Sequence, residues 1–234
     1  MTQHSKDLWR AEFFRSFIIE DGCAFSQGKA ADFLAEAHFY LKTIEEFIEG
    51  ARTRELDLLE KEADSLSESC RGNFWADYYP IHWETIFEFQ LRSSFIVSLA
   101  SFIEDYIKTV GWEVAIIMRD GKDPCKISCD VLHKLRRFLQ KRGGFKEPDD
   151  SLWSFLYNTY KLRNVLVHNG GKLHGPRRYK DLTRFIASES GISEEHGFIK
   201  IGRLFCEKAL RHTQQFVQAL HQQQRSFCKR AAKG

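Results

Sequence analysis

Residues 82–118 constrain the fold more than any other part of the sequence, because they are apolar on most sides of a helix. Two apolar stripes at helical spacing run along this stretch. They are Phe87, Leu91, Phe95, Leu99, Phe102 and Tyr106, and Ile86, Phe89, Ile96, Val97, Ile103 and Ile107. A helix with apolar residues on most sides has to be covered by its neighbours. We therefore place residues 82–118 in the middle of the domain.

Further helices follow from the same periodicity. Apolar residues at spacings of three and four predict helices over about residues 30–69, 128–142, 151–168 and 203–229, and a short amphipathic helix over residues 6–20. Gly-Asn and Tyr-Pro pairs predict a break over residues 71–80, and residues 192–201 are compatible with a small hairpin. With only four prolines, the pattern indicates an all-α, antiparallel helical bundle with four to five core helices. We expect residues 1–28 to be an N-terminal extension and residues 29–234 to be the helical domain.

The charges are unevenly distributed along the chain. Residues 45–68 contain nine acids and three bases, a net charge of −6, whereas residues 119–184 contain sixteen bases and seven acids, a net charge of +9. A basic segment suggests a polyanionic partner such as RNA or DNA. A solvated basic face is the alternative, and the acidic helix is also able to neutralise the basic segment within the fold.

The first residues lack the apolar run of a secretory signal, and no stretch resembles a membrane-spanning helix free of charge. We therefore expect a cytoplasmic protein without a membrane partner. Its six cysteines follow no disulfide-scaffold spacing. Cys125, Cys129 and His133 provide three potential zinc ligands, but they leave a tetrahedral site incomplete. We expect structural thiols there, no metal site and no organic cofactor.

Residues 161–171 carry the polar groups that most need an explanation. Arg163, Asn164 and His168 lie in the last turns of an otherwise apolar helix, and Asn-Gly-Gly follows as a helix stop. At 100° per residue, Asn164 and His168 are about 40° apart and Arg163 and His168 about 140° apart, so one broad side of the helix end presents all three. Burying a guanidinium without a partner is costly. Glu104, inside the apolar helix, is our candidate partner for Arg163; otherwise Glu104 is solvated at the rim.

A basic loop begins directly after this helix end. Its cations are placed to contact phosphates, and Tyr179 is available for stacking on a base. They are Lys172, His174, Arg177, Arg178 and Lys180. The sequence therefore predicts RNA-binding residues beside the polar cluster.

An arginine, a polar residue, three further residues and a histidine at the end of a bundle helix resemble the motif of the HEPN superfamily (higher eukaryote and prokaryote nucleotide-binding domains). Here the motif is Arg163-Asn164-Val-Leu-Val-His168. Residues 90–104 also look like an earlier core helix of the HEPN proteins associated with RNA ligases and toxins, and the resemblance covers residues 30–228. It implies a metal-independent RNA endonuclease, a homodimer whose two motifs line one cleft, and a toxin or antiviral effector with a possible antitoxin or other regulatory protein.

The chemistry of these residue types is consistent with that activity. RNA carries its own nucleophile, the 2′-hydroxyl, so a ribonuclease has to move protons and stabilise charge at phosphorus. Imidazole groups titrate near neutral pH and serve as acid or base, and guanidinium groups make paired hydrogen bonds to phosphate oxygens. We expect His168 and Arg163 to have these roles, with Asn164 orienting His168 or holding the phosphate.

Two other interpretations remain open. In the first, His168 and Asn169 only cap the helix, because the helix dipole favours a cation at its C-terminal end, and Arg163 forms an ion pair. In the second, the chain is a non-catalytic HEPN module that binds RNA, a nucleotide or a partner protein through the same basic face.

Overall fold

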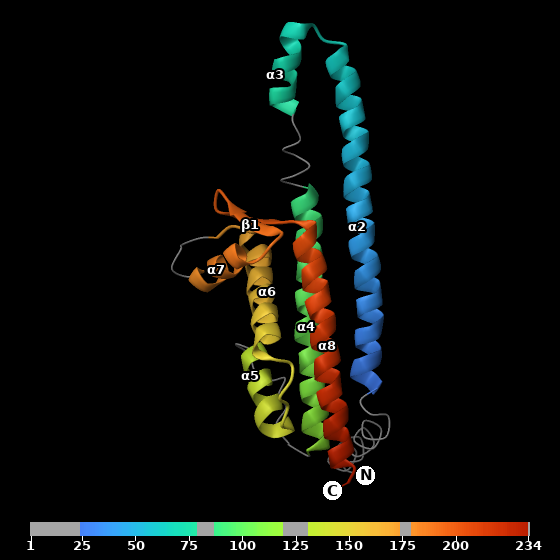
Figure 1. The fold of residues 1–234 in the computed structure, drawn as a ribbon, viewed down its shortest axis with the longest axis vertical. Helices are drawn as coiled ribbons and strands as arrows, with labels where there is room; N and C mark the ends of the chain where they lie inside the picture. Colours follow the sequence, from blue (N-terminus) through green and yellow to red (C-terminus); the bar gives the residue numbers. More distant parts are fainter. Residues whose placement is uncertain (1–23, 79–86, 119–130, 174–178, 234) are drawn as a thin grey trace, which may run out of the picture. The chain divides into compact units, whose positions relative to one another are not determined.

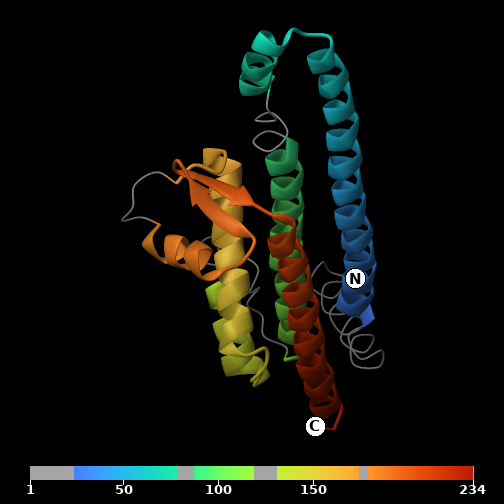
Figure 2. The ribbon, with the colours of Figure 1, turned by 45° about the horizontal axis from the view of Figure 1, so that its top comes forward.

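The computed structural model describes residues 24–78, 87–118, 131–173 and 179–233 (Figures 1 and 2). Over these residues the chain forms seven α-helices, a short π-helix and one two-stranded sheet. In chain order the elements are α2 (Ala24–Asp64), α3 (Glu68–Tyr78), α4 (Glu88–Ile117), α5 (Val131–Phe138), the π-helix η3 (Leu139–Gly143), α6 (Asp150–Asn169), α7 (Lys180–Ser188), β1 (Ile192–Glu195), β2 (Phe198–Ile201) and α8 (Arg203–Ala231). The predicted all-α helical bundle is confirmed. Within the described ranges, no helix is long and apolar enough to cross a membrane.

The chain divides into two compact units, each built from separate segments. Unit 1 comprises residues 1–36, 98–161 and 209–234, and unit 2 comprises residues 37–97 and 162–208. Helices α2, α4, α6 and α8 contribute residues to both units. The predicted boundary between residues 28 and 29 lies inside α2, and the predicted helix over residues 6–20 lies outside the described residues.

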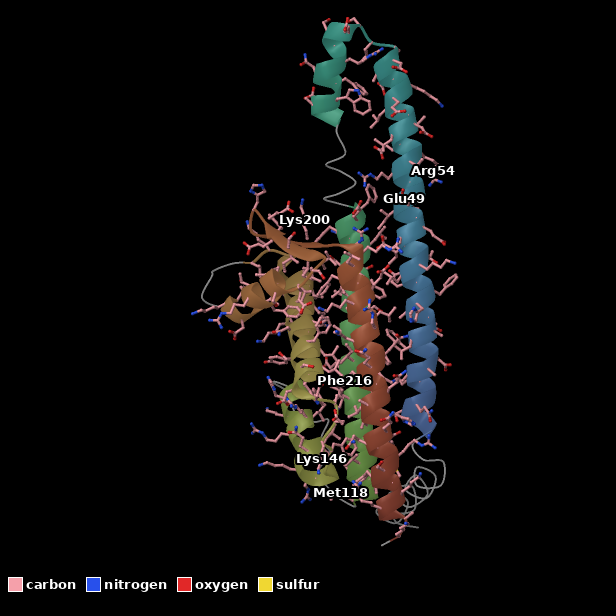
Figure 3. The ribbon with its side chains drawn as sticks, in the orientation of Figure 1. Glu49, Arg54, Met118, Lys146, Lys200 and Phe216 are labelled. Carbon is pink, nitrogen blue, oxygen red and sulfur yellow. The ribbon has the colours of Figure 1, made fainter. Side chains whose placement is uncertain are left out.

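The core of unit 1 is formed around residues 98–117 of α4. Tyr106, Ile107 and Val110 on this helix are fully buried. Trp153 of α6 meets the ring of Phe216 of α8 edge-on, with centroids 4.8 Å apart. Figure 3 labels Phe216 on α8. Aromatic pairs of this geometry add about 1 kcal/mol to the free energy gained from burial. We predicted that the apolar helix is covered by its neighbours, and this is confirmed for residues 98–117 of α4.

Helix α3 contradicts one prediction from the sequence. We predicted a break over residues 71–80, but residues 71–78 belong to α3, which continues through Gly72. The chain turns earlier, at residues 65–67. Arg71 explains the earlier turn: its Nε donates to the carbonyl of Ala63, 3.0 Å away, at the end of α2. This bond satisfies a carbonyl that the end of a helix leaves free. A glycine in a helix costs only about 1 kcal/mol, which neighbouring turns offset.

The hairpin of unit 2 forms where the sequence suggested. Strands β1 and β2 are antiparallel, with Ile192 opposite Ile201 and Glu195 opposite Phe198. The connection is His196-Gly197, and both residues have positive φ, at 52° and 81°. Two-residue turns with positive φ match the twist of the strands they join, and Gly is favoured there. The predicted small hairpin at residues 192–201 is therefore confirmed.

Unit 1 also buries the carboxyl group of Glu113, which has no basic partner among the described residues. The Glu113 side chain accepts hydrogen bonds from the Ser26 backbone amide (3.2 Å) and hydroxyl (2.8 Å), and from the Gln224 side-chain amide. All three residues are fully buried. Burial raises the pKa of Glu113 to about 7, and the hydrogen bonds from Ser26 and Gln224 oppose that shift. Glu113 therefore titrates close to neutral pH in the folded chain.

We expect this carboxyl to make stability fall as the pH rises. Between about pH 4.5, the ordinary pKa of the group, and about pH 7, the folded chain keeps a proton that the unfolded chain has lost. The free energy of unfolding therefore decreases across this window, by on the order of 3 kcal/mol in total, and stays level above it. Urea unfolding between pH 4.5 and pH 8 measures the slope.

The variant Glu113→Gln should lose this part of the pH dependence, because the amide does not titrate. Glu36→Gln, which removes an exposed carboxyl in the same unit, should keep the slope of the wild type. Equal slopes in wild type and Glu113→Gln would contradict the assignment.

Candidate functional site

Helix α6 positions the predicted polar cluster, and both of its ends are defined by local interactions. At its start, Asp149 Oδ1 accepts hydrogen bonds from the Leu152 backbone amide (2.9 Å) and the Ser151 hydroxyl (2.8 Å). These bonds hold the pKa of Asp149 below its ordinary value, the bond from the Leu152 amide contributing most. An N-terminal carboxylate cap of this kind stabilises a helix.

Two glycines end α6, as the sequence predicts. Gly170 and Gly171 both have positive φ, at 57° and 81°, and the Gly171 amide donates to the carbonyl of Val165, 3.2 Å away. The site of a Cβ atom at Gly171 lies only 2.6 Å from the ring of Phe89 on α4, whereas nothing lies within 4 Å at Gly170. The end of α6 therefore lies directly against Phe89, and only glycine fits there without a shift.

Backbone hydrogen bonds connect the hairpin to the residues that follow α6. The Leu173 amide donates to the carbonyl of Gly197 at 2.9 Å, and the Ile199 amide donates to the carbonyl of Gly171 at 3.0 Å. Lys172 and Phe198 form an isolated antiparallel bridge between these two bonds. The chain that leaves α6 is thus held as an extra edge segment beside β2, and this fixes the direction in which the basic loop begins.

The three predicted catalytic residues lie in unit 2 at this end of α6. His168 is exposed, and Arg163 and Asn164 are half-buried. Helix geometry separates the Cα atoms of Arg163 and His168 by about 9 Å. Nη1 of Arg163 donates to Oδ1 of Asn164 at 2.9 Å. Asn164 therefore holds the guanidinium rather than the imidazole, which differs from one of the two roles expected for it.

The guanidinium of Arg163 also retains hydrogen-bonding capacity. Its Nε is buried and has no hydrogen-bond partner among the described residues. A buried unpaired donor costs about 1–3 kcal/mol. The guanidinium of Arg163 thus keeps a donor that no described residue uses, and the side chain as a whole is half-buried.

Glu104 lies in unit 1, whereas Arg163 lies in unit 2. Oε1 of Glu104 pairs with the ammonium group of Lys108, 2.5 Å away and one turn further along α4. Glu104 thus has a local partner, and its pairing with Arg163 stays a prediction.

The predicted RNA-binding loop is only partly described. Lys172 and Lys180 are exposed in unit 2, and the Lys172 ammonium lies 5.4 Å from the centre of the Phe198 ring. Asn169, next to His168, donates to the Tyr179 hydroxyl at 3.0 Å. His174, Arg177 and Arg178 lie outside the described residues. Both described ends of the loop therefore lie near the end of α6: Lys172 follows it in the chain, and Tyr179 is hydrogen-bonded to Asn169.

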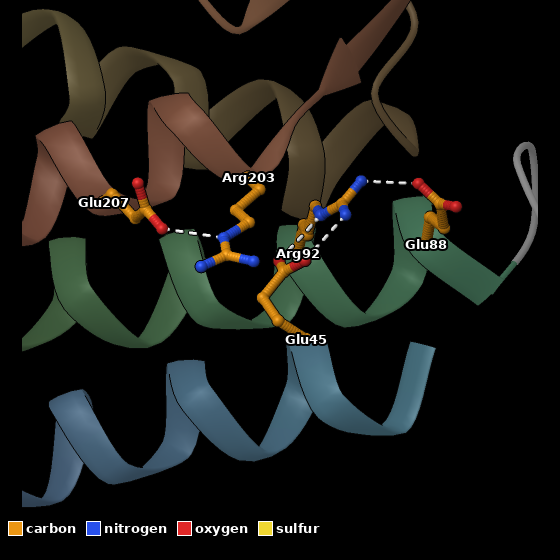
Figure 4. Close-up of polar contacts among 5 residues, drawn as sticks. All are labelled: Glu45, Glu88, Arg92, Arg203 and Glu207. Carbon is orange, nitrogen blue, oxygen red and sulfur yellow. Dashed lines mark hydrogen bonds and ion pairs between the residues drawn. The ribbon is translucent and has the colours of Figure 1, made fainter. Parts of the chain in front are cut away.

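Sequence reasoning missed an ionic cluster in the same unit. Arg92 on α4 donates from Nε and Nη2 to the two carboxylate oxygens of Glu45 on α2, at 2.9 and 2.8 Å, and from Nη1 to Glu88 at 2.5 Å (Figure 4). The three side chains are only 11–16 % exposed. These carboxylates, Glu45 most of all, raise the pKa of Arg92. The i,i+4 spacing of Glu88 and Arg92 was a signal in the sequence for half of this cluster, whereas the pairing with Glu45 on α2 had none.

Beside this cluster lies a pocket of about 460 Å³ in unit 2. Its walls come from Arg52 on α2, from Glu88, Phe89 and Arg92 on α4, and from hairpin residues 191–193 and 200–202. Phe89 is the side chain against which Gly171 packs. The pocket and the end of α6 therefore share one aromatic residue. In the described segments, no group of three or more His, Cys, Asp or Glu is arranged to hold a metal ion.

Comparisons with protein-family models, with curated proteins and with solved structures give no match.

Replacement of Gly171 tests the geometry of the helix end. We expect Gly171→Ala to lower the free energy of unfolding by about 2–3 kcal/mol, because the new methyl group meets the Phe89 ring in addition to the strain of positive φ. Gly170→Ala, which meets no neighbouring atom, should cost only about 1 kcal/mol. Urea unfolding of both variants measures the difference, and equal costs would contradict the described contact.

Proposed function

We propose that the protein is a metal-independent RNA endonuclease of the HEPN type. One observation carries the proposal: an exposed histidine, His168, lies on the last turn of a helix that also holds a guanidinium, Arg163, in place through Asn164. An exposed imidazole is accessible to a substrate hydroxyl, and a half-buried guanidinium that is held in place is suited to a phosphate.

In the proposed reaction, an imidazole removes the proton from the 2′-hydroxyl of the RNA. The 2′-oxygen then forms a bond to phosphorus, and the bond from phosphorus to the 5′-oxygen of the next nucleotide breaks. A second acid gives a proton to that 5′-oxygen. The products are a 2′,3′-cyclic phosphate and a free 5′-hydroxyl, so no water is consumed in this step. Arg163 stabilises the negative charge that develops on the phosphorane oxygens.

We further propose that two copies of the chain form the active dimer. One His168 then acts as the base and the other as the acid, and two Arg163 side chains contact one phosphate. Exposed apolar side chains in unit 2 support a contact with a second copy, because Val167 and Phe198 are 48 % and 45 % exposed. Val167 directly precedes His168, so a dimer contact there brings the two histidines close together.

The substrate chain in this proposal follows the basic loop. Lys172 and Lys180 are exposed at its two ends, and His174, Arg177 and Arg178 lie between them in the sequence. Cations contact phosphates without reading the bases, so these residues supply affinity for RNA rather than sequence preference.

In biological terms, we propose that the nuclease is cytoplasmic and acts as a toxin or an antiviral effector, restrained by an antitoxin or another regulatory protein. A cytoplasmic location agrees with Cys206 and Cys228, which are buried free thiols. Limiting the activity of an RNA endonuclease protects the cell that produces it.

Substitution of the two motif residues tests the proposed activity. We expect His168→Ala and Arg163→Ala each to reduce RNA cleavage by at least about 100-fold, because they remove proton transfer and charge stabilisation respectively. Arg163→Lys should be more active than Arg163→Ala but less active than the wild type, since an ammonium does not make paired hydrogen bonds. Initial rates on a labelled RNA, with a chelator present, measure these effects.

Matched controls come from the same unit. His196→Asn replaces an exposed histidine in the hairpin turn with a residue that tolerates positive φ, and Arg184→Ala removes an arginine that is 67 % exposed. Both controls should cleave like the wild type. Full activity in His168→Ala and Arg163→Ala would overturn the proposal. RNA binding by a wild type that does not cleave would favour the non-catalytic module.

A further inference from the structure

Unit 1 contains two basic stretches that are far apart in the chain. Residues 139–146 cover η3 and the turn after it, and residues 225–233 cover the end of α8. Neither stretch contains an acid. Their bases, all of them exposed, are Lys141, Arg142, Lys146, Arg225, Lys229, Arg230 and Lys233.

The fold of unit 1 joins the two stretches. Nη2 of Arg230 donates to the carbonyl of Gly143 at 3.3 Å. The Lys146 amide donates to Oε1 of Gln223, just before the second stretch, at 3.1 Å. Both stretches also contribute residues to the walls of a pocket of about 530 Å³. They therefore form one basic surface, which we call the unit 1 basic surface.

Six of the seven bases have no carboxylate partner among the described residues. Arg142 has an interaction of its own and is not counted. No ion pair joins any of the other six to an acid of the described segments. The bond from Arg230 goes to a neutral carbonyl, which leaves the charge of the guanidinium uncompensated. Residues 119–130, outside the described part of the chain, contain three bases and three acids and so add no net charge.

The helix ends at this surface account for only a small part of its charge. Helix α4 ends at Ile117 and α8 at Ala231, and both residues line the pocket. The C-terminal end of a helix attracts cations, but it is equivalent to only about half a negative charge, so two ends offset about one positive charge. Most of the charge of the six bases is therefore left for a partner.

Three of the six bases form a row. Arg225 and Lys229 are one turn apart on α8, so their Cα atoms are about 6 Å from each other on one side of the helix. Lys233 follows four residues later, and its amide still bonds to the carbonyl of Arg230 at 3.2 Å, past the end of the helix. Like charges at this spacing repel each other and destabilise a helix. A linear polyanion relieves the repulsion along the whole row, whereas a small anion reaches only part of it.

The apolar side chains at this surface distinguish between two kinds of polyanion. Among the large apolar side chains that are exposed in the described residues, only Met118, at 38 %, borders the pocket. Binding to an anionic membrane surface uses an apolar face that enters the lipid as well as cations. A nucleic-acid strand needs mainly a basic surface that follows its backbone. The composition of the surface therefore favours a nucleic acid over a membrane.

We propose that the unit 1 basic surface binds the phosphate backbone of a single-stranded nucleic acid. The proposal does not depend on the ribonuclease activity. Together with that activity, the surface adds affinity for the substrate RNA. Cations contact phosphates without reading the bases, so this binding depends on salt and has no sequence preference.

The test measures binding to the full chain with His168→Ala, which keeps an RNA ligand intact. Fluorescence anisotropy of a labelled oligouridine gives the affinity over a series of salt concentrations. We expect the triple variant Arg225→Gln, Lys229→Gln, Lys233→Gln to bind at least about tenfold more weakly at low salt. The slope of log affinity against log salt should become shallower by about 2, because each phosphate contact on a single strand contributes about 0.7.

A matched control removes the same charge from unit 2. Lys42→Gln, Arg54→Gln, Lys61→Gln replaces one arginine and two lysines at exposed positions of the acidic helix α2. This triple variant should keep the affinity and the salt slope, and circular dichroism confirms that both triple variants are folded. Equal effects of the two triple variants on affinity and slope would overturn the proposal.

The first stretch is tested separately. Lys141→Gln combined with Lys146→Gln should make the salt slope shallower by about 1.4, since two phosphate contacts are lost. An unchanged slope would contradict a single surface formed by both stretches.

Further ligands identify the source of the phosphates. RNA and DNA strands carry the same phosphodiesters, so an oligodeoxyuridine is titrated beside the oligouridine. Weaker binding of both strands by the α8 triple variant is expected for contacts to phosphate, and weaker binding of the RNA alone identifies RNA as the ligand. Vesicles that contain phosphatidylserine represent the membrane. Binding to these vesicles without binding to either strand would overturn the proposal.

Failure of this surface and failure of the nuclease are distinguishable. If RNA binds through the row on α8 but the chain with an intact motif does not cleave it, the surface stands and the ribonuclease activity does not. If RNA is cleaved through His168 while the α8 triple variant binds like its control, the nuclease stands and the surface is wrong.

Discussion

The end of α6 is the constraint on which the candidate site depends. Gly170 and Gly171 end the helix with positive φ, and Gly171 packs so closely on Phe89 that no side chain fits between them. Two backbone hydrogen bonds then tie the next residues to the hairpin. His168 lies on the last turn of α6 and is exposed, and the basic loop begins just beyond the helix end. Phe89 also forms part of the wall of the pocket in unit 2.

The two units bury ionisable groups in different ways. In unit 2, Arg92 is surrounded by Glu45 and Glu88 and stays charged because both partners are close. In unit 1, Glu113 accepts hydrogen bonds from the neutral donors of Ser26 and Gln224, and burial raises its pKa to about 7. A buried charge is tolerated when it is paired, and an unpaired carboxyl instead takes up a proton. The raised pKa of Glu113 therefore makes the stability of unit 1 sensitive to pH.

Local patterns in the sequence predicted α2, α4, α5, α6 and α8, the hairpin and the helix stop, because each depends on residues close together in the chain; α3 was not predicted. The pairing of Arg92 with Glu45 was not predicted, since these residues lie 47 positions apart. The burial of Glu113 was not predicted either. The sequence suggested Glu104 as the unusual acid of α4, whereas among the described residues the fully buried carboxyl is that of Glu113, nine residues and about 180° further round the helix. Periodicity shows that a helix is apolar on most sides, but the packing of distant segments decides which polar residue is buried.

The central claim is that the 2′-hydroxyl of the RNA attacks its own neighbouring phosphate with the help of His168 and Arg163. The most direct measurement compares cleavage of an RNA by the wild type with cleavage of the same RNA carrying a 2′-O-methyl group at the cut nucleotide, with a chelator present and the product ends identified by mass spectrometry. The claim predicts a 2′,3′-cyclic phosphate and a 5′-hydroxyl from the first RNA and no cut at the methylated position of the second. Cleavage at the methylated nucleotide, or a 5′-phosphate on the product, would contradict it.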